Sequence, residues 1–139
     1  MTSTTTRAAV TAHLSSLAAV AAVTAAAGRP IIWAGLVAFA GPLIARLSFG
    51  RRDPFVRRHA SAALAFNASL ALYLGLIIAC LRLTAGSPYT VQLVPFLLFV
   101  NMLLALNWLV FTAIAMQRAS AGQTFTYPLT LRRRSGAAA

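Results

Sequence analysis

The chain has 139 residues, of which 60% are hydrophobic and only 9% are charged. Soluble domains carry about 25% charged residues, so this chain has too little polar surface to form a water-soluble globule and needs lipid to cover it. The length fits one domain, residues 1–139. The twelve basic residues are all arginine, and the chain has one acidic residue, Asp53, so its net charge is +11.

These arginines lie at the ends of apolar runs, as topology signals of membrane proteins do, and not in a patch interleaved with aromatic residues. We therefore predict no nucleic-acid partner. Anionic lipid headgroups are the expected counter-charge, at about 1 kcal/mol for each basic residue near the surface. The single cysteine, Cys80, lies in an apolar run and excludes an intrachain disulfide.

Two apolar runs, 8–27 and 31–49, follow a polar start that we expect to be frayed. The first run resembles a secretory signal peptide, but a second apolar run follows it at once and leaves no polar domain to export. We predict a membrane helix in each run. Gly28-Arg29-Pro30 separates them, because proline removes a helix donor, and Gly41-Pro42 predicts a kink in the second.

The central segment predicts a helix that begins at Asp53-Pro54, since a carboxylate can cap exposed amides and proline suits the first turn. The alternative role for Asp53 is to pair with Arg57, which lies four residues later on the same helix. Phe55, His59, Ala62 and Phe66 recur at helical spacing, so an amphipathic start is expected to run into the third membrane helix, 54–83. Thirty residues span about 45 Å, which is longer than the ~30 Å hydrocarbon core.

A short loop at 84–91 leads into a fourth helix at 92–117, entered through Pro95, and a basic tail at 118–139. The positive-inside rule then sets the orientation. Only Arg29 and Arg82 fall outside, whereas the predicted inner side carries Arg7, Arg46, Arg51, Arg52, Arg57, Arg58, Arg118, Arg132, Arg133 and Arg134. The predicted fold class is an all-α integral membrane four-helix bundle of the bacterial inner membrane, with both termini in the cytoplasm.

The chain is poor in groups that could perform catalysis, which needs an acid, a base or an activated nucleophile within reach of one another. We predict no catalytic residue, no metal site and no cofactor, and hence no enzyme. His13 and His59 lie at similar predicted depth on different helices, so haem ligation or a quinone pocket is the alternative to two interfacial histidines. No helix carries the carboxylate that a proton-coupled exporter needs. Three amides inside the helices predict interhelical hydrogen bonds or, alternatively, a solute path: Asn67, Asn101 and Asn107.

Four short motifs occur in the order found in a bacterial family of unknown function: His13-Leu14-Ser15, Gly41-Pro42-Leu43-Ile44, the stretch 53–60 and Tyr127-Pro128-Leu129-Thr130. That family resembles the Tic-twenty subunit of the chloroplast import translocon. The resemblance spans about residues 13–132 and implies a four-helix membrane fold. Relatives carry a run like E-A-L-N-F-Q where this chain has 62–67, so an acid and one amide are missing.

We expect a small non-enzymatic accessory or assembly subunit that packs against a larger membrane complex or against copies of itself. The alternative is a channel or a Tic-twenty-like translocation component, although a shared fold is poor support for a shared function. Any functional surface is expected on the cytoplasmic side. The predicted contacts with a partner or with lipid are Arg51, Arg52, Asp53, Pro54, Phe55, Arg57, Arg58, His59, Tyr127, Pro128, Arg132, Arg133 and Arg134.

Overall fold

A computed structural model describes residues 3–27, 32–50 and 53–128 of the chain. Its elements are α1 (Ser3–Ala27), the 3-10 helix η1 (Ile32–Val37), α2 (Ala40–Ser48), α3 (Pro54–Leu83) and α4 (Thr90–Ser120). No strand occurs in these described ranges, so the predicted all-helical bundle is confirmed. The helix predicted at 54–83 has the bounds of α3, and α1 begins earlier than expected, inside the polar start.

Among the described residues, three helices are long and apolar enough to cross a membrane, within α1, α3 and α4. The second predicted span, 31–49, differs from expectation, because its described part is divided into η1 and the nine-residue α2. Proline is tolerated in the first turn of a helix, where its missing N–H leaves no bond unmade. The helix therefore restarts at Ala40 and places Pro42 in that first turn, so the expected kink is a break just before Gly41-Pro42.

The start of α3 follows the predicted local chemistry. One carboxylate oxygen of Asp53 accepts hydrogen bonds from the backbone N–H of Phe55 at 2.8 Å and of Val56 at 3.4 Å. Pro54 occupies the first helical position, where a proline is favoured. Asp53 thus caps the helix, as predicted, and does not form an ion pair with Arg57.

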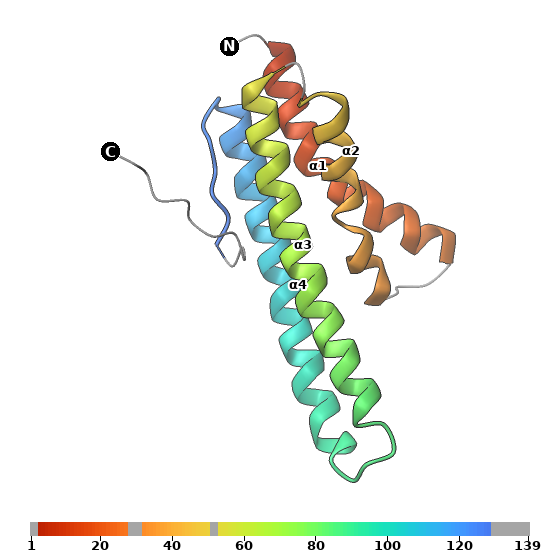
Figure 1. Cartoon of the computed structure of the whole chain (residues 1–139). Coiled ribbons are helices and arrows are strands. Elements are labelled where there is room, and N and C mark those ends of the chain that lie inside the picture. The colour runs from red at the N-terminus through yellow and green to blue at the C-terminus, as the bar shows by residue number, and fades with distance from the viewer. Residues whose placement is uncertain (1–2, 28–31, 51–52, 129–139) are drawn as a thin grey trace, which may run out of the picture.

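α3 and α4 form a long antiparallel pair, α1 crosses this pair obliquely, and α2 packs on α1 and α3 (Figure 1). Where α1, α2 and α3 meet, the core consists of three small residues, Ala12, Ala45 and Ala60. The α1–α2 contact is close, because a Cβ atom built on Gly41 would lie 2.2 Å from the carbonyl oxygen of Ser15. Small side chains of this kind let membrane helices approach each other.

The segment after α4 turns back along the bundle instead of leaving it (Figure 1). Gly122 has a φ of 71°, a left-handed conformation that glycine adopts without steric cost, and it allows this reversal. Tyr127 then packs with Phe66 of α3 and Ala115 of α4, while Trp108, Phe111 and Phe125 cover the cluster. The tail predicted as a basic appendage is therefore part of the core up to Tyr127.

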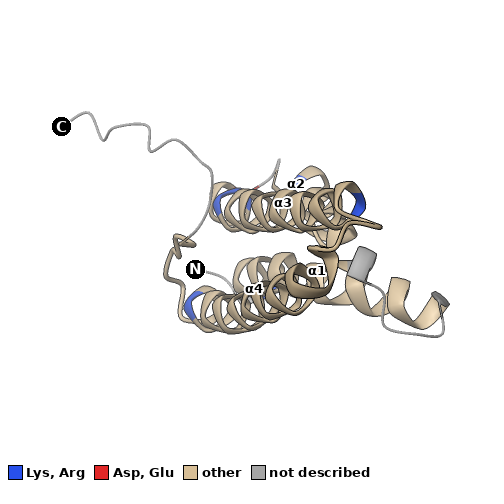
Figure 2. Ribbon diagram, turned by 90° about the horizontal axis from the view of Figure 1, so that it is seen from below, with Lys and Arg blue, Asp and Glu red and all other residues tan. Residues whose placement is uncertain are grey.

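Basic residues lie near the helix ends (Figure 2). α3 carries arginine at 57 and 58 and again at 82, whereas α4 carries only Arg118, in its last turn. The uncharged middle parts of α3 and α4 suit a hydrocarbon environment, in which ionised side chains are costly.

Candidate functional site

A buried polar chain joins three segments that are distant in the sequence. Nε2 of His13, on α1, lies 3.0 Å from Nδ1 of His59, on α3. On the other side of the same ring, Nδ1 of His13 lies 2.9 Å from the hydroxyl of Tyr127. All three side chains are at most 4% exposed. Buried polar groups need such partners, because an unpaired one costs about 1–3 kcal/mol.

Helical periodicity directs both histidines inward. Ala9, Ala12, His13 and Ser16 are the buried residues of α1, at the spacing of one helix face. On α3 the corresponding face continues from His59 through Ala63 to Phe66 and Asn67. The sequence thus correctly predicted two histidines at similar depth on two helices, and the structure shows that they hydrogen-bond to each other.

Aromatic contacts hold Tyr127 in place at the end of the chain of hydrogen bonds. Its ring stacks on Phe66 with centroids 4.2 Å apart and an interplanar angle of 15°, and it meets Phe125 edge-on at 5.0 Å. Burial raises the pKa of the Tyr127 phenol, so the group keeps its proton at neutral pH. A neutral phenol can donate to His13 or accept from it, according to the tautomer of the ring.

One nitrogen of the cluster is left over. Nε2 of His59 is buried and has no hydrogen-bond partner of ordinary geometry within the described chain. The backbone of Gln123 lies close to the His59 ring. If Tyr127 donates to His13, then His13 donates to His59, and this Nε2 carries the last proton. The cluster is therefore a linear chain of donors and acceptors that ends next to the returning segment.

The same geometry argues against haem or metal ligation by this cluster. The two histidine nitrogens that face each other are 3.0 Å apart, and the Tyr127 hydroxyl lies on the opposite side of the His13 ring. The three donors therefore do not converge on one point where an ion could bind. In the part of the chain that the structure describes, no group of three or more His, Cys, Asp or Glu side chains could hold a metal ion.

The predicted amides behave differently from one another. Oδ1 of Asn67 accepts from the indole N–H of Trp108 at 2.9 Å, so this residue does join α3 to α4. Nδ2 of Asn107 donates to the carbonyl of Leu103 in its own helix. The side chain of Asn101 has no hydrogen bond to any described residue. Asn67 is therefore the only one of the three amides that bonds between helices within the described ranges.

The predicted contact surface divides into an outer and an inner part. Arg57 and Arg58 are exposed, as are Pro54 and Pro128, while Asp53 and Phe55 are half-buried. His59 and Tyr127 lie in the interior, Tyr127 because the segment after α4 folds back. The ring of Phe55 packs on that of His59, with the two ring centroids 4.5 Å apart. Arg51, Arg52, Arg132, Arg133 and Arg134 lie outside the described residues. Sequence reasoning missed Trp108, since an aromatic residue in an apolar helix carries no signal of its partner.

Comparison with known proteins corrects the predicted resemblance. No curated protein and no solved structure matches the chain significantly. The profile of the MamF/MmsF family matches residues 5–133, almost the whole chain. The predicted likeness to the Tic-twenty subunit is therefore wrong, since the short motifs behind it occur in a chain that matches another family along its length. With three apolar helices in its described part, this is a multi-pass membrane protein that belongs to the magnetosome magnetite crystal formation protein family.

Proposed function

We propose that this chain is a small, non-enzymatic membrane protein that acts in magnetite crystal formation as an accessory or assembly subunit. It would associate through its helices with copies of itself or with a larger membrane complex. Membership of the magnetosome magnetite crystal formation family supports the process. The outward surface of α4 is the structural observation that supports assembly.

The most apolar stretch of α4 contributes little to the interior of the bundle. Only 6% of this 18-residue stretch is buried, whereas 22% of the most apolar stretch of α1 and 28% of that of α3 are buried. Its exposed side chains include Phe96, Phe99, Met102 and Leu106. Lipid covers such a surface as well as a protein does, so the apolar residues alone do not identify a partner.

The amides on α4 favour a protein partner. Asn107 bonds only to its own helix, and Asn101 makes no hydrogen bond within the described chain. An amide inside the hydrocarbon region finds few partners in lipid, and a hydrogen bond to another helix contributes about 0.6–2 kcal/mol. Association through α4 would supply that partner.

The engagement of the acidic and histidine side chains supports a non-enzymatic role. The carboxylate of Asp53 caps α3, and His13 and His59 are bonded to each other in the interior. These groups are therefore engaged in structural contacts. The channel alternative has less support, because alanines close the junction of α1, α2 and α3, and Gly41 lies against the backbone of Ser15.

The orientation predicted from the arginines, with both termini in the cytoplasm, remains part of this proposal. The start of α3 and the end of α4 lie at the same end of the bundle (Figure 1). This arrangement is compatible with Arg57, Arg58 and Arg118 facing one membrane surface.

Complementation tests the process directly. The gene is expressed in a magnetite-forming bacterium that lacks its own member of the family, and crystal size and number are measured by electron microscopy. We expect restored crystals; crystals that stay as in the deletion strain contradict the role in crystal formation.

Assembly is tested separately with the purified protein in mild detergent, by native electrophoresis and cross-linking. We expect oligomers that Asn107→Leu weakens. Gln117→Leu is the matched control, because it removes an exposed amide near the end of the same helix. A wild-type protein that is purely monomeric and recovers no stoichiometric partner from membranes would refute the assembly role.

A further inference from the structure

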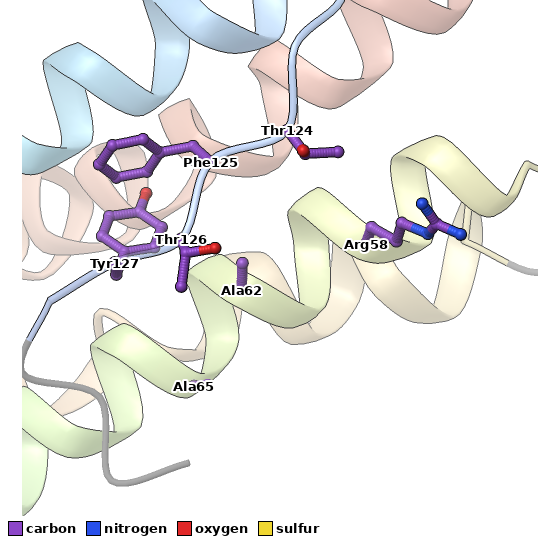
Figure 3. Close-up of a pocket in the computed structure, with 7 residues that line it drawn as sticks. All are labelled: Arg58, Ala62, Ala65, Thr124, Phe125, Thr126 and Tyr127. Carbon is purple, nitrogen blue, oxygen red and sulfur yellow. The ribbon is translucent and has the colours of Figure 1, made fainter. Parts of the chain in front are cut away.

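An open groove of about 230 Å³ lies between α3 and the segment that returns after α4 (Figure 3). The α3 side consists of Arg58, Ala62 and Ala65, which share one helix face because they are four and three residues apart. The other side is the run 124–127. The two alanines leave room that larger side chains would fill.

Three polar side chains of the groove lining, those of Arg58, Thr124 and Thr126, can bind an anion. Arg58 is exposed and forms no ion pair or hydrogen bond with any other described residue. Thr124 and Thr126 are exposed and contribute hydroxyl groups to the opposite side. The groove has no carboxylate among its lining residues. The only acid of the chain, Asp53, already caps α3.

The apolar groups are at the other end. Ala65 lies seven positions after Arg58, which is about 10 Å farther along α3. Over that length the lining residues change from Arg58 to Ala65, Phe125 and Tyr127 (Figure 3). The charged end lies at the end of the bundle where α3 begins and α4 finishes with Arg118. The apolar end lies farther along α3, toward the hydrocarbon core.

A phospholipid has the same distribution of chemistry, with a phosphate at the interface and acyl chains below it. We propose that this groove binds one anionic phospholipid. The phosphate pairs with Arg58 and with the hydroxyls of Thr124 and Thr126, and one acyl chain lies over Ala62 and Ala65. The absence of a carboxylate from the groove lining and the net charge of +11 favour an anionic over a zwitterionic lipid. This inference does not depend on the proposed role in crystal formation.

Native mass spectrometry of the full-length protein tests this proposal, after exchange into micelles that contain phosphatidylglycerol or phosphatidylcholine. We expect one retained phosphatidylglycerol and no retained phosphatidylcholine. Arg58→Gln should reduce the retained lipid by about tenfold, as for the loss of about 1.4 kcal/mol. Arg57→Gln should not, because Arg57 is also exposed and adjacent but does not line the groove.

A second pair of variants keeps every charge. Ala65→Leu fills the apolar end and should release the lipid, whereas Ala68→Leu adds the same volume at an exposed position of α3 outside the groove and should not. An equal loss in Arg57→Gln and Arg58→Gln would show general attraction to the surface and overturn the site. So would retention in Ala65→Leu, equal retention of both lipids, or displacement of the lipid by millimolar inorganic phosphate.

Discussion

The hydroxyl of Tyr127 lies 2.9 Å from Nδ1 of His13, although 114 positions separate the two residues in the chain. This bond joins the segment after the last helix to the first helix. Since His13 also bonds to His59, the contact links α1, α3 and the returning segment at one point. The end of the described chain is therefore a structural element of the bundle, and its removal should destabilise the core.

A double-mutant cycle should detect this bond. In His13→Phe, the hydroxyl of Tyr127 and Nδ1 of His59 both lose the His13 partner, which should lower the free energy of unfolding by at least about 1–3 kcal/mol. Tyr127→Phe removes one hydroxyl and should cost about 1 kcal/mol. The double variant should be more stable than the sum predicts, by about 0.5–3 kcal/mol. Unfolding in micelles measures all three, and strict additivity would contradict a direct contact.

Truncation of the Tyr127 ring should release the returning segment. Tyr127→Ala removes the stack on Phe66 as well as the hydrogen bond, and loss of a buried aromatic ring costs about 3–5 kcal/mol. Trypsin should then cleave after Arg118 faster than in the wild-type protein. Pro128→Ala is the control, because Pro128 is exposed. Equal cleavage rates in all three proteins would show that Tyr127 does not hold the segment.

Two glycines should respond in opposite directions to alanine. Gly41→Ala places a methyl group 2.2 Å from the Ser15 carbonyl oxygen, and the backbone of α1 must move. Overpacking of this kind costs about 1–3 kcal/mol. Gly75→Ala, inside α3 with no atom within 4 Å of the new methyl group, should stabilise the protein by about 0.5–1 kcal/mol. Thermal unfolding in micelles compares the two, and a stabilising Gly41→Ala would disprove the close α1–α2 contact.

Acid should weaken the start of α3. Partial loss of water raises the pKa of Asp53, but hydrogen bonds from the Phe55 amide, the Thr5 hydroxyl and the Val56 amide outweigh this effect and hold the pKa below its ordinary value of 3.8. A lowered pKa in the folded protein means that the stabilisation is present above pH 3.8 and is lost as the pH falls through the folded value. Asp53→Asn can still cap the helix but cannot titrate.

The melting temperature of the wild-type protein should therefore fall more between pH 5 and pH 3 than that of Asp53→Asn. The difference between the two proteins isolates the carboxylate from any other group that titrates in this range. Identical pH profiles would show that the Asp53 charge does not stabilise the fold.

The orientation should depend on the arginines at the start of α3. Arg57→Glu with Arg58→Glu removes two positive charges from the predicted inner side and should lower the fraction of molecules with a cytoplasmic C-terminus. Fluorescence of a C-terminal fusion that matures only in the cytoplasm measures this fraction. Arg82→Glu, at the other end of α3, should leave it unchanged. Unchanged topology in the double variant would show that these charges do not set it.

The sequence by itself determined the membrane class and the features that depend on neighbours in the chain. Low charge and long apolar runs require lipid around the helices, so the all-helical bundle followed from composition. The start of α3 followed from Asp53-Pro54, because a cap acts on amides two and three residues away. The resemblance drawn from short motifs was wrong, and only a match over residues 5–133 identified the family.

The tertiary structure alone decided which distant residues meet. The sequence placed His13 and His59 at similar depth, but only the crossing of α1 over α3 brings their nitrogens within 3.0 Å. No periodicity indicates that Tyr127 returns to Phe66, since that depends on a reversal after α4. Helix formation is local, whereas these contacts depend on how the helices and the returning segment pack together.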